Sequence, residues 1–413
     1  MTSSIRWFAM AAAACTVLVC VKADAQTVGT FPFLNRDRVV FLGDSNTRAN
    51  DFVNLVEQYT ILRFPTRKVT FFNVGIGGDT AEGGAARFER DVLSKYPTVV
   101  FVTYGVNDLF ASTVDRFVAA IEQMVSAARS RNIRIYVSTY PLLGLDAVEM
   151  NAPLREWGDA AIARATALGG LSVDVSRRME AIAGSHPGES LYATHDFISG
   201  VHLSDVGHNL WAFSLLQGIG APAEASSVTI DAATLVASAS GAVVSGVSGG
   251  PTSLRFTRLD EGLPISFGAL SALSIGFVPW DQIARYSLRI TNLAPGNYEI
   301  RAEGLQITAD LPQGDTTVSA DQLAAGLSIR ERAANPFAAA GPWGMKSTTV
   351  GNYVAGRMAM AILTQDQLWE LPADPKGRGL RSAQKSLNDR IGDVARLAAT
   401  PYPFQFEVAR VGP

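Results

Sequence analysis

The chain has 413 residues and a formal net charge of −3; 47% of its residues are hydrophobic and 18% are charged. This balance is that of a globular protein, and the length favours two domains. The absence of a basic excess argues against a nucleic-acid partner.

The first 25 residues have the features of a secretory signal peptide. Arg6 supplies a positive charge and Trp7–Val21 form an apolar stretch. Residues 23–25, Ala-Asp-Ala, resemble a cleavage site, so we expect the mature chain to begin at Gln26. An uncleaved membrane anchor is the alternative, but the stretch is short for a membrane span. We therefore expect a periplasmic or secreted protein whose mature chain does not span a membrane.

Both cysteines, Cys15 and Cys20, lie within this leader. The mature chain would then lack disulfides, a thiolate nucleophile and a cysteine metal site. The four histidines form no His-x-x-x-His pair. We therefore expect no metal and no cofactor.

From residue 38 to about residue 217, strand-like apolar runs alternate with helical patterns. The predicted strands are Val39–Leu42, Val69–Phe72, Val99–Val102, Ile133–Ser138 and Leu171–Val175. The predicted helices are Phe52–Leu62, Ala81–Ser94, Val114–Ser130, Pro153–Ala167 and Asp205–Leu216. This alternation indicates an α/β fold with a parallel sheet covered on both faces. Right-handed crossovers then favour a three-layer α/β/α sandwich.

The pattern changes near residue 218. Gly218–Ser253 is rich in small residues and is either a linker or a set of small-residue strands. Further predicted strands are Ser253–Arg258, Tyr286–Thr291, Tyr298–Ala302 and, as an edge strand, Phe404–Val408. Predicted helices are Asp321–Ala325, Thr348–Ile362 and Ser382–Ala399. We predict a signal peptide at 1–25, a first domain at 26–217 and a C-terminal mixed β/α domain at 218–413.

Three polar positions follow predicted strands of the first domain. They are Ser45 in Gly-Asp-Ser, Gly78 in Gly-Gly-Asp-Thr, and Asn107 in Gly-Val-Asn-Asp. Strands of a doubly wound sheet open their C-terminal ends on the edge where such folds bind ligands. A hydroxyl, a backbone N–H and a side-chain amide converging there would form a nucleophile with an oxyanion hole.

A serine nucleophile needs a base, and the chain offers His186, His195, His202 and His208. His202 immediately precedes the last helix of the first domain, from where a loop can reach Ser45, so we predict His202 as the general base. His208 falls inside that helix, where a packing or capping role is expected. The other two histidines lie in a polar loop and are expected to face solvent.

Each of these patterns also has a structural interpretation. The glycines at 75–78 are compatible with a plain tight turn, and Asn107 with Asp108 is compatible with a helix-capping pair. No Gly-Lys-Ser/Thr follows the glycines, so a phosphate-binding loop is not indicated. A literal Gly-x-Ser-x-Gly occurs at 246–250, but Pro251 follows it and no histidine lies downstream, unlike in a nucleophile elbow.

Taken together, these blocks resemble the SGNH hydrolases, also called GDSL-type esterases and lipases. The matching blocks, in family order over about residues 38–217, are residues 43–45, 73–80, 105–108 and 200–203. The resemblance implies a flavodoxin-like fold with Ser45 as nucleophile, His202 as base, and Gly78 and Asn107 in the oxyanion hole. Residues 78–92 further resemble an exported bacterial branch that carries a C-terminal extension.

The sequence departs from the family at Ser199, where an Asp usually stands three residues before the histidine. That Asp normally orients the imidazole. Three interpretations are open. Asp196 in the same loop could replace the missing Asp, or a neutral acceptor, the Ser199 hydroxyl or a backbone carbonyl, could orient the imidazole. In the third interpretation the site is impaired. We expect a dyad with a neutral orienting acceptor.

The sequence therefore predicts an exported carboxylic ester hydrolase that works through an acyl-enzyme on Ser45. By family analogy the substrate is an acylated carbohydrate, for instance one with O-acetyl groups, or a small ester. An acyltransferase using the same site is one alternative, and a catalytically impaired carbohydrate- or surface-binding protein is the other. Trp280, Trp343 and Trp369 are candidates for stacking on sugars, although a place in the core is the commoner explanation.

Overall fold

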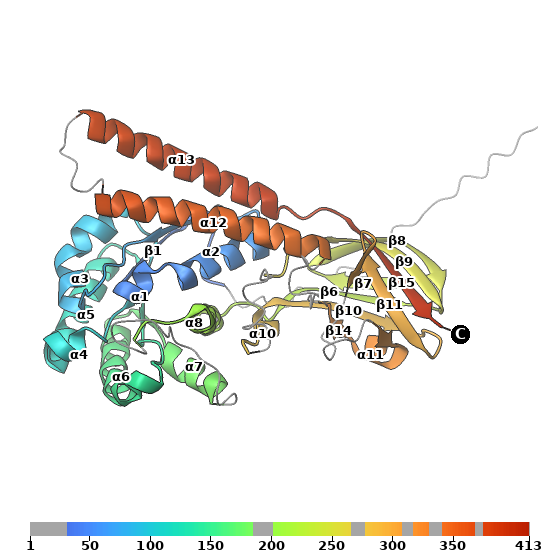
Figure 1. The fold of residues 1–413 in the computed structure, drawn as a ribbon, viewed down its shortest axis with the longest axis horizontal. Helices are drawn as coiled ribbons and strands as arrows, with labels where there is room; N and C mark the ends of the chain where they lie inside the picture. The colour runs from blue at the N-terminus through green and yellow to red at the C-terminus, as the bar shows by residue number, and fades with distance from the viewer. Residues whose placement is uncertain are drawn as a thin grey trace, which may run out of the picture.

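The computed structural model describes residues 31–184, 201–265, 277–307, 317–329, 341–367 and 375–412. The predicted signal peptide lies outside these residues, as do Trp369 and the polar loop before residue 201. Figure 1 shows an α/β body with strand β1 and helices α1–α8, joined to a β-rich body that contains the C-terminus. Two long helices, α12 and α13, run alongside the α/β body.

The first body is built on a parallel sheet with strand order β2-β1-β3-β4-β5. The strands are β1 Arg38–Gly43, β2 Thr70–Asn73, β3 Val99–Thr103, β4 Arg134–Ser138 and β5 Leu171–Val173. Each coincides within a few residues with a strand predicted from the apolar runs. The predicted parallel sheet is confirmed.

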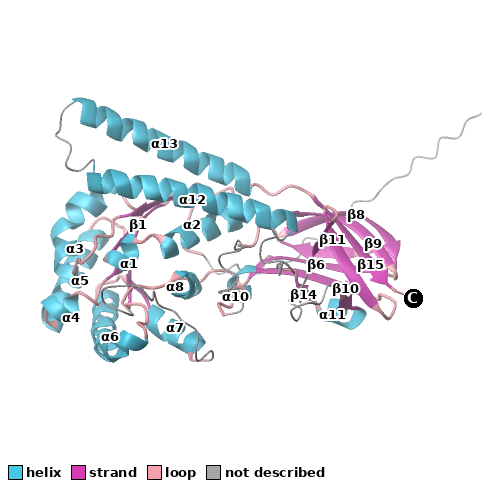
Figure 2. Ribbon diagram, in the orientation of Figure 1, coloured by secondary structure: helices cyan, strands magenta, loops and turns pink. Residues whose placement is uncertain are grey.

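The sheet is buried on both faces because its central strands are continuously apolar. In β1, Val39 and Phe41 point into one hydrophobic cluster while Val40 and Leu42 point into another. Successive side chains of a strand alternate between the two faces, so a fully apolar strand requires cover on both sides. This packing produces the predicted three-layer sandwich, whose helices are cyan and strands magenta in Figure 2.

Helices cover both faces of this sheet. They are α1 Ser45–Arg48, α2 Asp51–Arg63, α3 Ala81–Arg87, α4 Asp108–Ala111, α5 Val114–Arg129, α6 Asn151–Ala167, α7 Val175–Ala183 and α8 Asp205–Gly218. Apolar side chains of α2, α7 and α8 belong to the cluster on one face, and those of α3, α5 and α6 to the cluster on the other.

The short helices α1, α4 and η3 Leu145–Met150 were not predicted from the sequence, and two longer segments of this body also differ from the prediction. The helix predicted to run from Ala81 to Ser94 ends at Arg87 and continues as a π-helix and a 3-10 helix, η1 Phe88–Val92 and η2 Leu93–Lys95. Helix α7 is not predicted from the sequence, because the apolar Val175 reads as a continuation of the preceding strand. Asp174 ends that strand by accepting a hydrogen bond from the backbone N–H of Arg177 as the N-cap of α7.

The described part of the C-terminal region is a mixed β/α assembly, as predicted. Its strands are β6 Glu224–Asp231, β7 Ala237–Ser240, β8 Ala242–Gly250, β9 Ser253–Asp260, β10 Arg285–Thr291, β11 Asn297–Ala302, β12 Leu305–Ile307, β13 Val318–Ser319, β14 Leu327–Ser328 and β15 Phe404–Val411. They pair as one sheet of order β14-β10-β6-β7 and another of order β12-β11-β15-β9-β8, with β13 beside β11. The segment after residue 218 is therefore strand rather than linker.

The prediction that Phe404–Val408 is an edge strand was wrong. Strand β15 is paired on both sides, with β9 and with β11, both antiparallel. Its alternation of buried and half-exposed side chains fits a strand with one face on the core, and this pattern is the same for edge and interior strands. The position was set by distant pairing partners.

The helices of the C-terminal region are α10 Asp281–Ala284, α11 Ala320–Ala325, α12 Gly341–Gln367 and α13 Pro375–Ala399. Helix α12 packs against α2 of the first body (Figure 1). The Gln58 side chain donates to the Ser347 carbonyl at 2.9 Å, and Arg357 forms a buried ion pair with Glu57. The α12–α13 pair is thus attached to the α/β body by buried polar contacts.

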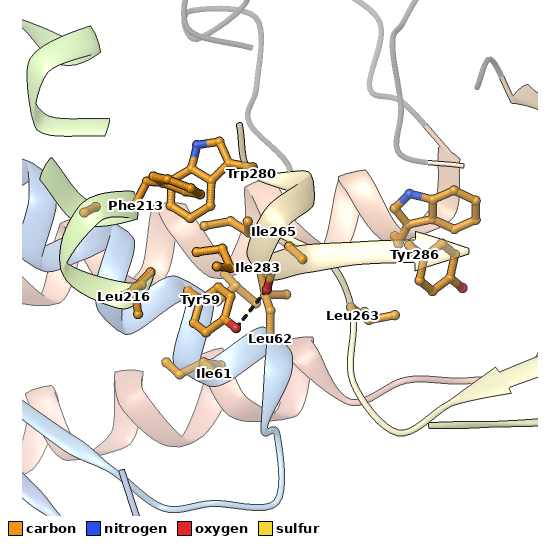
Figure 3. Close-up of a cluster of buried hydrophobic side chains, with 14 of the residues drawn as sticks. Tyr59, Ile61, Leu62, Phe213, Leu216, Leu263, Ile265, Trp280, Ile283 and Tyr286 are labelled. Carbon is orange, nitrogen blue, oxygen red and sulfur yellow. Dashed lines mark hydrogen bonds between the residues drawn. The ribbon is translucent and has the colours of Figure 1, made fainter. Parts of the chain in front are cut away.

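A shared apolar cluster also joins the two bodies (Figure 3). Phe213 of α8 packs edge-on against Trp280, with ring centroids 5.8 Å apart. The Tyr59 hydroxyl donates to the Ile283 carbonyl at 3.0 Å. Trp280 and Trp343 are both buried, so they belong to the core rather than to a sugar-stacking surface. Among the described residues, no helix has the length and apolarity needed to cross a bilayer.

Candidate active site

Ser45 stands at the tight turn between β1 and α1. An added Cβ at Gly43 would lie 2.2 Å from Thr47 Oγ1 and 2.7 Å from the Thr103 carbonyl oxygen, so only glycine fits there. Asp44 caps α1 by accepting a hydrogen bond from the Asn46 backbone N–H at 3.0 Å. The turn leaves Ser45 half-buried at the C-terminal edge of the sheet.

His202 lies beside Ser45 although 157 residues separate them in the sequence. Its Nε2 atom is 2.8 Å from Ser45 Oγ. His202 lies two residues before Ser204, the N-cap of α8, which accepts a hydrogen bond from the Gly207 N–H at 3.4 Å. A histidine nitrogen at this distance from a serine hydroxyl is the geometry required for proton transfer between them.

Gly78 follows β2 and Asn107 follows β3, the two strands that flank β1 in the sheet. Gly78 has a φ of +72°, a conformation that favours glycine, and no atom from elsewhere in the described chain lies within 4 Å of where its Cβ would be. The Asn107 side-chain amide donates to the carbonyl of Asp79 at 2.9 Å. This hydrogen bond ties the Asn107 side chain to the residue directly after Gly78.

The Asp79 carboxylate is held by groups that the sequence did not point to. Arg87 donates to it from Nε at 2.9 Å and from its terminal guanidinium nitrogen at 2.7 Å, and the Tyr104 hydroxyl donates at 2.8 Å. Arg87 also donates to the Val74 carbonyl at 2.7 Å. The loop that carries Gly78 is therefore fixed by a buried ion pair. An Asp followed eight residues later by an Arg is too common a spacing to reveal such a pair.

Two buried carboxyl groups lie next to the predicted catalytic residues. Burial raises the pKa of Asp44 to about 7, against hydrogen bonds from Tyr140 and Asn46 that lower it. Burial likewise raises the pKa of Asp108 to about 6, although its carboxylate accepts a hydrogen bond from the Ala81 N–H at 2.9 Å. Two carboxyl groups beside the site therefore have pKa values above their usual range.

His208, the other histidine that the structure describes, is not part of this pairing. His208 is buried inside α8, with its ring stacked near Phe52 and Trp211 at centroid distances of 6.3 Å and 6.0 Å. Burial lowers the pKa of His208 to about 3, so it packs as a neutral ring, in agreement with the packing role predicted for it. His186 and His195 lie outside the described residues.

The predicted orienting groups for His202, Asp196 and Ser199, also lie outside the described residues. Asn46 is a site residue that the sequence patterns did not single out, and its only sequence signal is a polar side chain directly after the candidate nucleophile. The structure buries it between the segments that carry Ser45 and His202. Within the described residues, no group of three or more His, Cys, Asp or Glu side chains is arranged to hold a metal ion.

The comparisons with known proteins match the part of the chain that contains these residues. Residues 41–210 match the model of the GDSL-like Lipase/Acylhydrolase family. The uncharacterized lipoprotein YqeF of Bacillus subtilis (strain 168) is 38% identical over 76 residues, which cover 17% of this chain and 31% of that protein. The chain therefore spans less than a third of the length of this curated relative.

Among solved structures, BT4096, described as a gut microbial diltiazem-metabolizing enzyme, superposes with a TM-score of 0.76 at 20% identity and covers 92% of this chain and 99% of that chain. This likeness shows that the two proteins share a fold over both bodies of the chain. Axe2, an acetylxylan esterase from Geobacillus stearothermophilus, superposes with a TM-score of 0.41 at 22% identity, covering 46% of this chain and 96% of that chain. Residues 41–210 of the chain therefore carry a GDSL-like lipase/acylhydrolase domain.

Proposed function

We propose that this protein hydrolyses its ester through an acyl-enzyme formed on Ser45. The observation that carries the proposal is the 2.8 Å separation between Ser45 Oγ and His202 Nε2. In the first step the Ser45 oxygen attacks the ester carbonyl carbon while His202 Nε2 takes the hydroxyl proton. The imidazolium then returns that proton to the leaving alkoxide as the carbon–oxygen bond of the alcohol breaks.

Hydrolysis of the acyl-enzyme reverses the roles. His202 takes a proton from water, the resulting hydroxide attacks the acyl carbon, and the bond to Ser45 Oγ breaks. The proton returns to Ser45, and the carboxylic acid is released. For the other ring nitrogen of His202 we propose a neutral acceptor, the Ser199 hydroxyl or a backbone carbonyl, in place of the usual carboxylate.

The oxyanion formed in each attack needs hydrogen-bond donors. We assign this role to the backbone N–H groups of Ser45 and Gly78 and to the Asn107 side-chain amide. The amide carries two N–H groups, of which one is bonded to Asp79. The other is the proposed oxyanion donor, and the Asp79 contact holds the amide in place.

As substrate we propose a small acyl ester carried by an exported carbohydrate, with O-acetyl groups as the first to test. The signal-like leader supports export, and the acylhydrolase family supports the acyl ester. The carbohydrate part rests on analogy alone, so the assay begins with a simple ester.

Turnover of p-nitrophenyl acetate tests the proposal. Ser45→Ala removes the nucleophile, so we expect kcat to fall by at least about 10³-fold. The control is Ser130→Ala, which removes a hydroxyl from the exposed end of α5 and should leave kcat unchanged. Full turnover by Ser45→Ala would contradict the proposal. Acylated sugar forming in place of free acid when a sugar is added would instead identify an acyltransferase.

A further inference from the structure

Asn46 connects the segment that carries Ser45 to the segment that carries His202. Its side-chain nitrogen donates to the Val201 carbonyl at 3.0 Å and to the Tyr140 hydroxyl at 2.9 Å. Its side-chain oxygen accepts from the Leu203 N–H at 3.2 Å. Asn46 is only 1% exposed, so water does not compete for these contacts.

The orientation of this carboxamide is unambiguous. A backbone carbonyl can only accept a hydrogen bond and a backbone N–H can only donate one. The Val201 carbonyl therefore requires the nitrogen of Asn46, and the Leu203 N–H requires its oxygen. No other neutral side chain of this size offers donors and an acceptor on one planar group.

We propose that Asn46 is a positioning residue that sets the separation between His202 and Ser45. Its side chain hydrogen-bonds to the peptide groups on both sides of His202, and its own backbone is covalently bonded to Ser45. One short side chain thereby fixes the position of the base relative to the nucleophile. The inference rests on the catalytic pair proposed above and adds a residue that does not touch the reacting atoms.

The Ser45 side of this connection is also anchored. Tyr140 is only 2% exposed, and its hydroxyl accepts a hydrogen bond from Asn46 at 2.9 Å. The Asp44 carboxyl group accepts from the Asn46 backbone N–H at 3.0 Å. Asp44 and Asn46 flank Ser45 in the chain, as Val201 and Leu203 flank His202. The two neighbours of the nucleophile are thus hydrogen-bonded to each other, and Asn46 is also hydrogen-bonded to the neighbours of the base.

The chain provides a matched control for a merely structural asparagine. Asn151 is buried, and its side chain makes the same pair of backbone hydrogen bonds, accepting from the Leu143 N–H at 2.8 Å and donating to the Leu143 carbonyl at 2.9 Å. These bonds span neither Ser45 nor His202. A substitution at Asn151 therefore reports the cost of losing such a pair without disturbing the catalytic separation.

The experiment compares Asn46→Leu with Asn151→Leu in the full chain, with p-nitrophenyl acetate as substrate and thermal unfolding as the measure of stability. We expect both variants to lose stability. Displacing a catalytic group by about 1 Å can cost about 100-fold in rate, so Asn46→Leu should lower kcat by about 10- to 100-fold. Its KM should change little, because no contact with the substrate is lost. Asn151→Leu should keep the kcat of the parent protein.

Asn46→Asp is the second variant, for the case that Asn46→Leu does not fold. It keeps the acceptor for Leu203 and the shape of the side chain but loses both donors, and we expect the same fall in kcat. If the parent protein turns over the ester and the Asn46 variants retain its kcat, as Asn151→Leu does, the positioning role is wrong while the catalytic pair stands. If Ser45→Ala retains turnover, the catalytic pair is wrong and the positioning role falls with it.

Discussion

The chemistry of the site depends on individual side chains whose neighbours are buried. Asp44 directly precedes Ser45, is fully enclosed, and lies near Tyr140, Asp79 and Asp108. Burial raises the pKa of Asp44 from 3.8 to about 7, because a carboxylate without water is unfavourable. The residue next to the nucleophile therefore couples folding to pH.

The sign of this coupling follows from proton binding. Between about pH 4 and about pH 7 the folded chain keeps a proton on Asp44 that the unfolded chain releases, so stability falls as pH rises. Asp44→Asn removes this pH-dependent contribution. The free energy of unfolding of the variant, measured relative to that of the parent protein, should therefore rise with pH by up to about 4 kcal/mol. Urea unfolding at several pH values measures it. A difference between the two proteins that does not vary with pH would contradict the shifted pKa.

The sequence identified the residues with reactive groups but not those that hold them. Ser45 and His202 stand in short motifs, and the structure places them in hydrogen-bond contact. The contacts of Asn46 join residues 94 and 155 positions away, so no local pattern reveals them. The burial of Tyr140 and the Arg87–Asp79 ion pair likewise depend on how the loops fold over the strand ends.

At the element scale, the junction of α2 and α12 depends on a buried ion pair. Glu57 and Arg357 are both buried, and Arg357 also donates to the Phe71 carbonyl at 3.3 Å. Burial raises the pKa of Glu57, and Arg357 acts in the opposite direction. Each charge is therefore tolerated only because the other is present.

Arg357→Met should leave a buried charge without its partner and lower the free energy of unfolding by about 3–5 kcal/mol. Replacing both residues, in Glu57→Met with Arg357→Met, should recover most of that loss because no charge then remains to be buried. Urea unfolding of the single and double variants measures the difference. A double variant less stable than the single one would show that the pair itself stabilises the junction.

The elements themselves were predictable where the local pattern is strong. The parallel strands and most helices of the first body follow from apolar runs and helical spacing. The place of β15 in its sheet did not, since β9 lies about 150 residues before it in the chain. The packing of α12 on α2 could not be predicted either, because the sequence of an apolar helix face does not identify the surface against which it packs.

At the scale of the whole molecule, the predicted boundary at residues 217 and 218 falls inside a continuous core. Phe213 and Leu62 on one side share a cluster with Trp280 and Ile283 on the other. A chain of residues 31–217 would expose this apolar surface to water. We expect such a fragment to lose cooperative thermal unfolding and to bind a hydrophobic dye, as loosely packed states do. A fragment that unfolds at the temperature of the full chain would show that the first body is independent.

The most direct test of the catalytic pair is covalent. A serine-directed phosphonate is incubated with the full chain, and the modified peptide is identified by tandem mass spectrometry. We predict one phosphonyl group on Ser45, attached far more slowly in His202→Ala because the proton acceptor is gone. Labelling at another residue, or labelling of Ser45 at an unchanged rate without His202, would contradict the account.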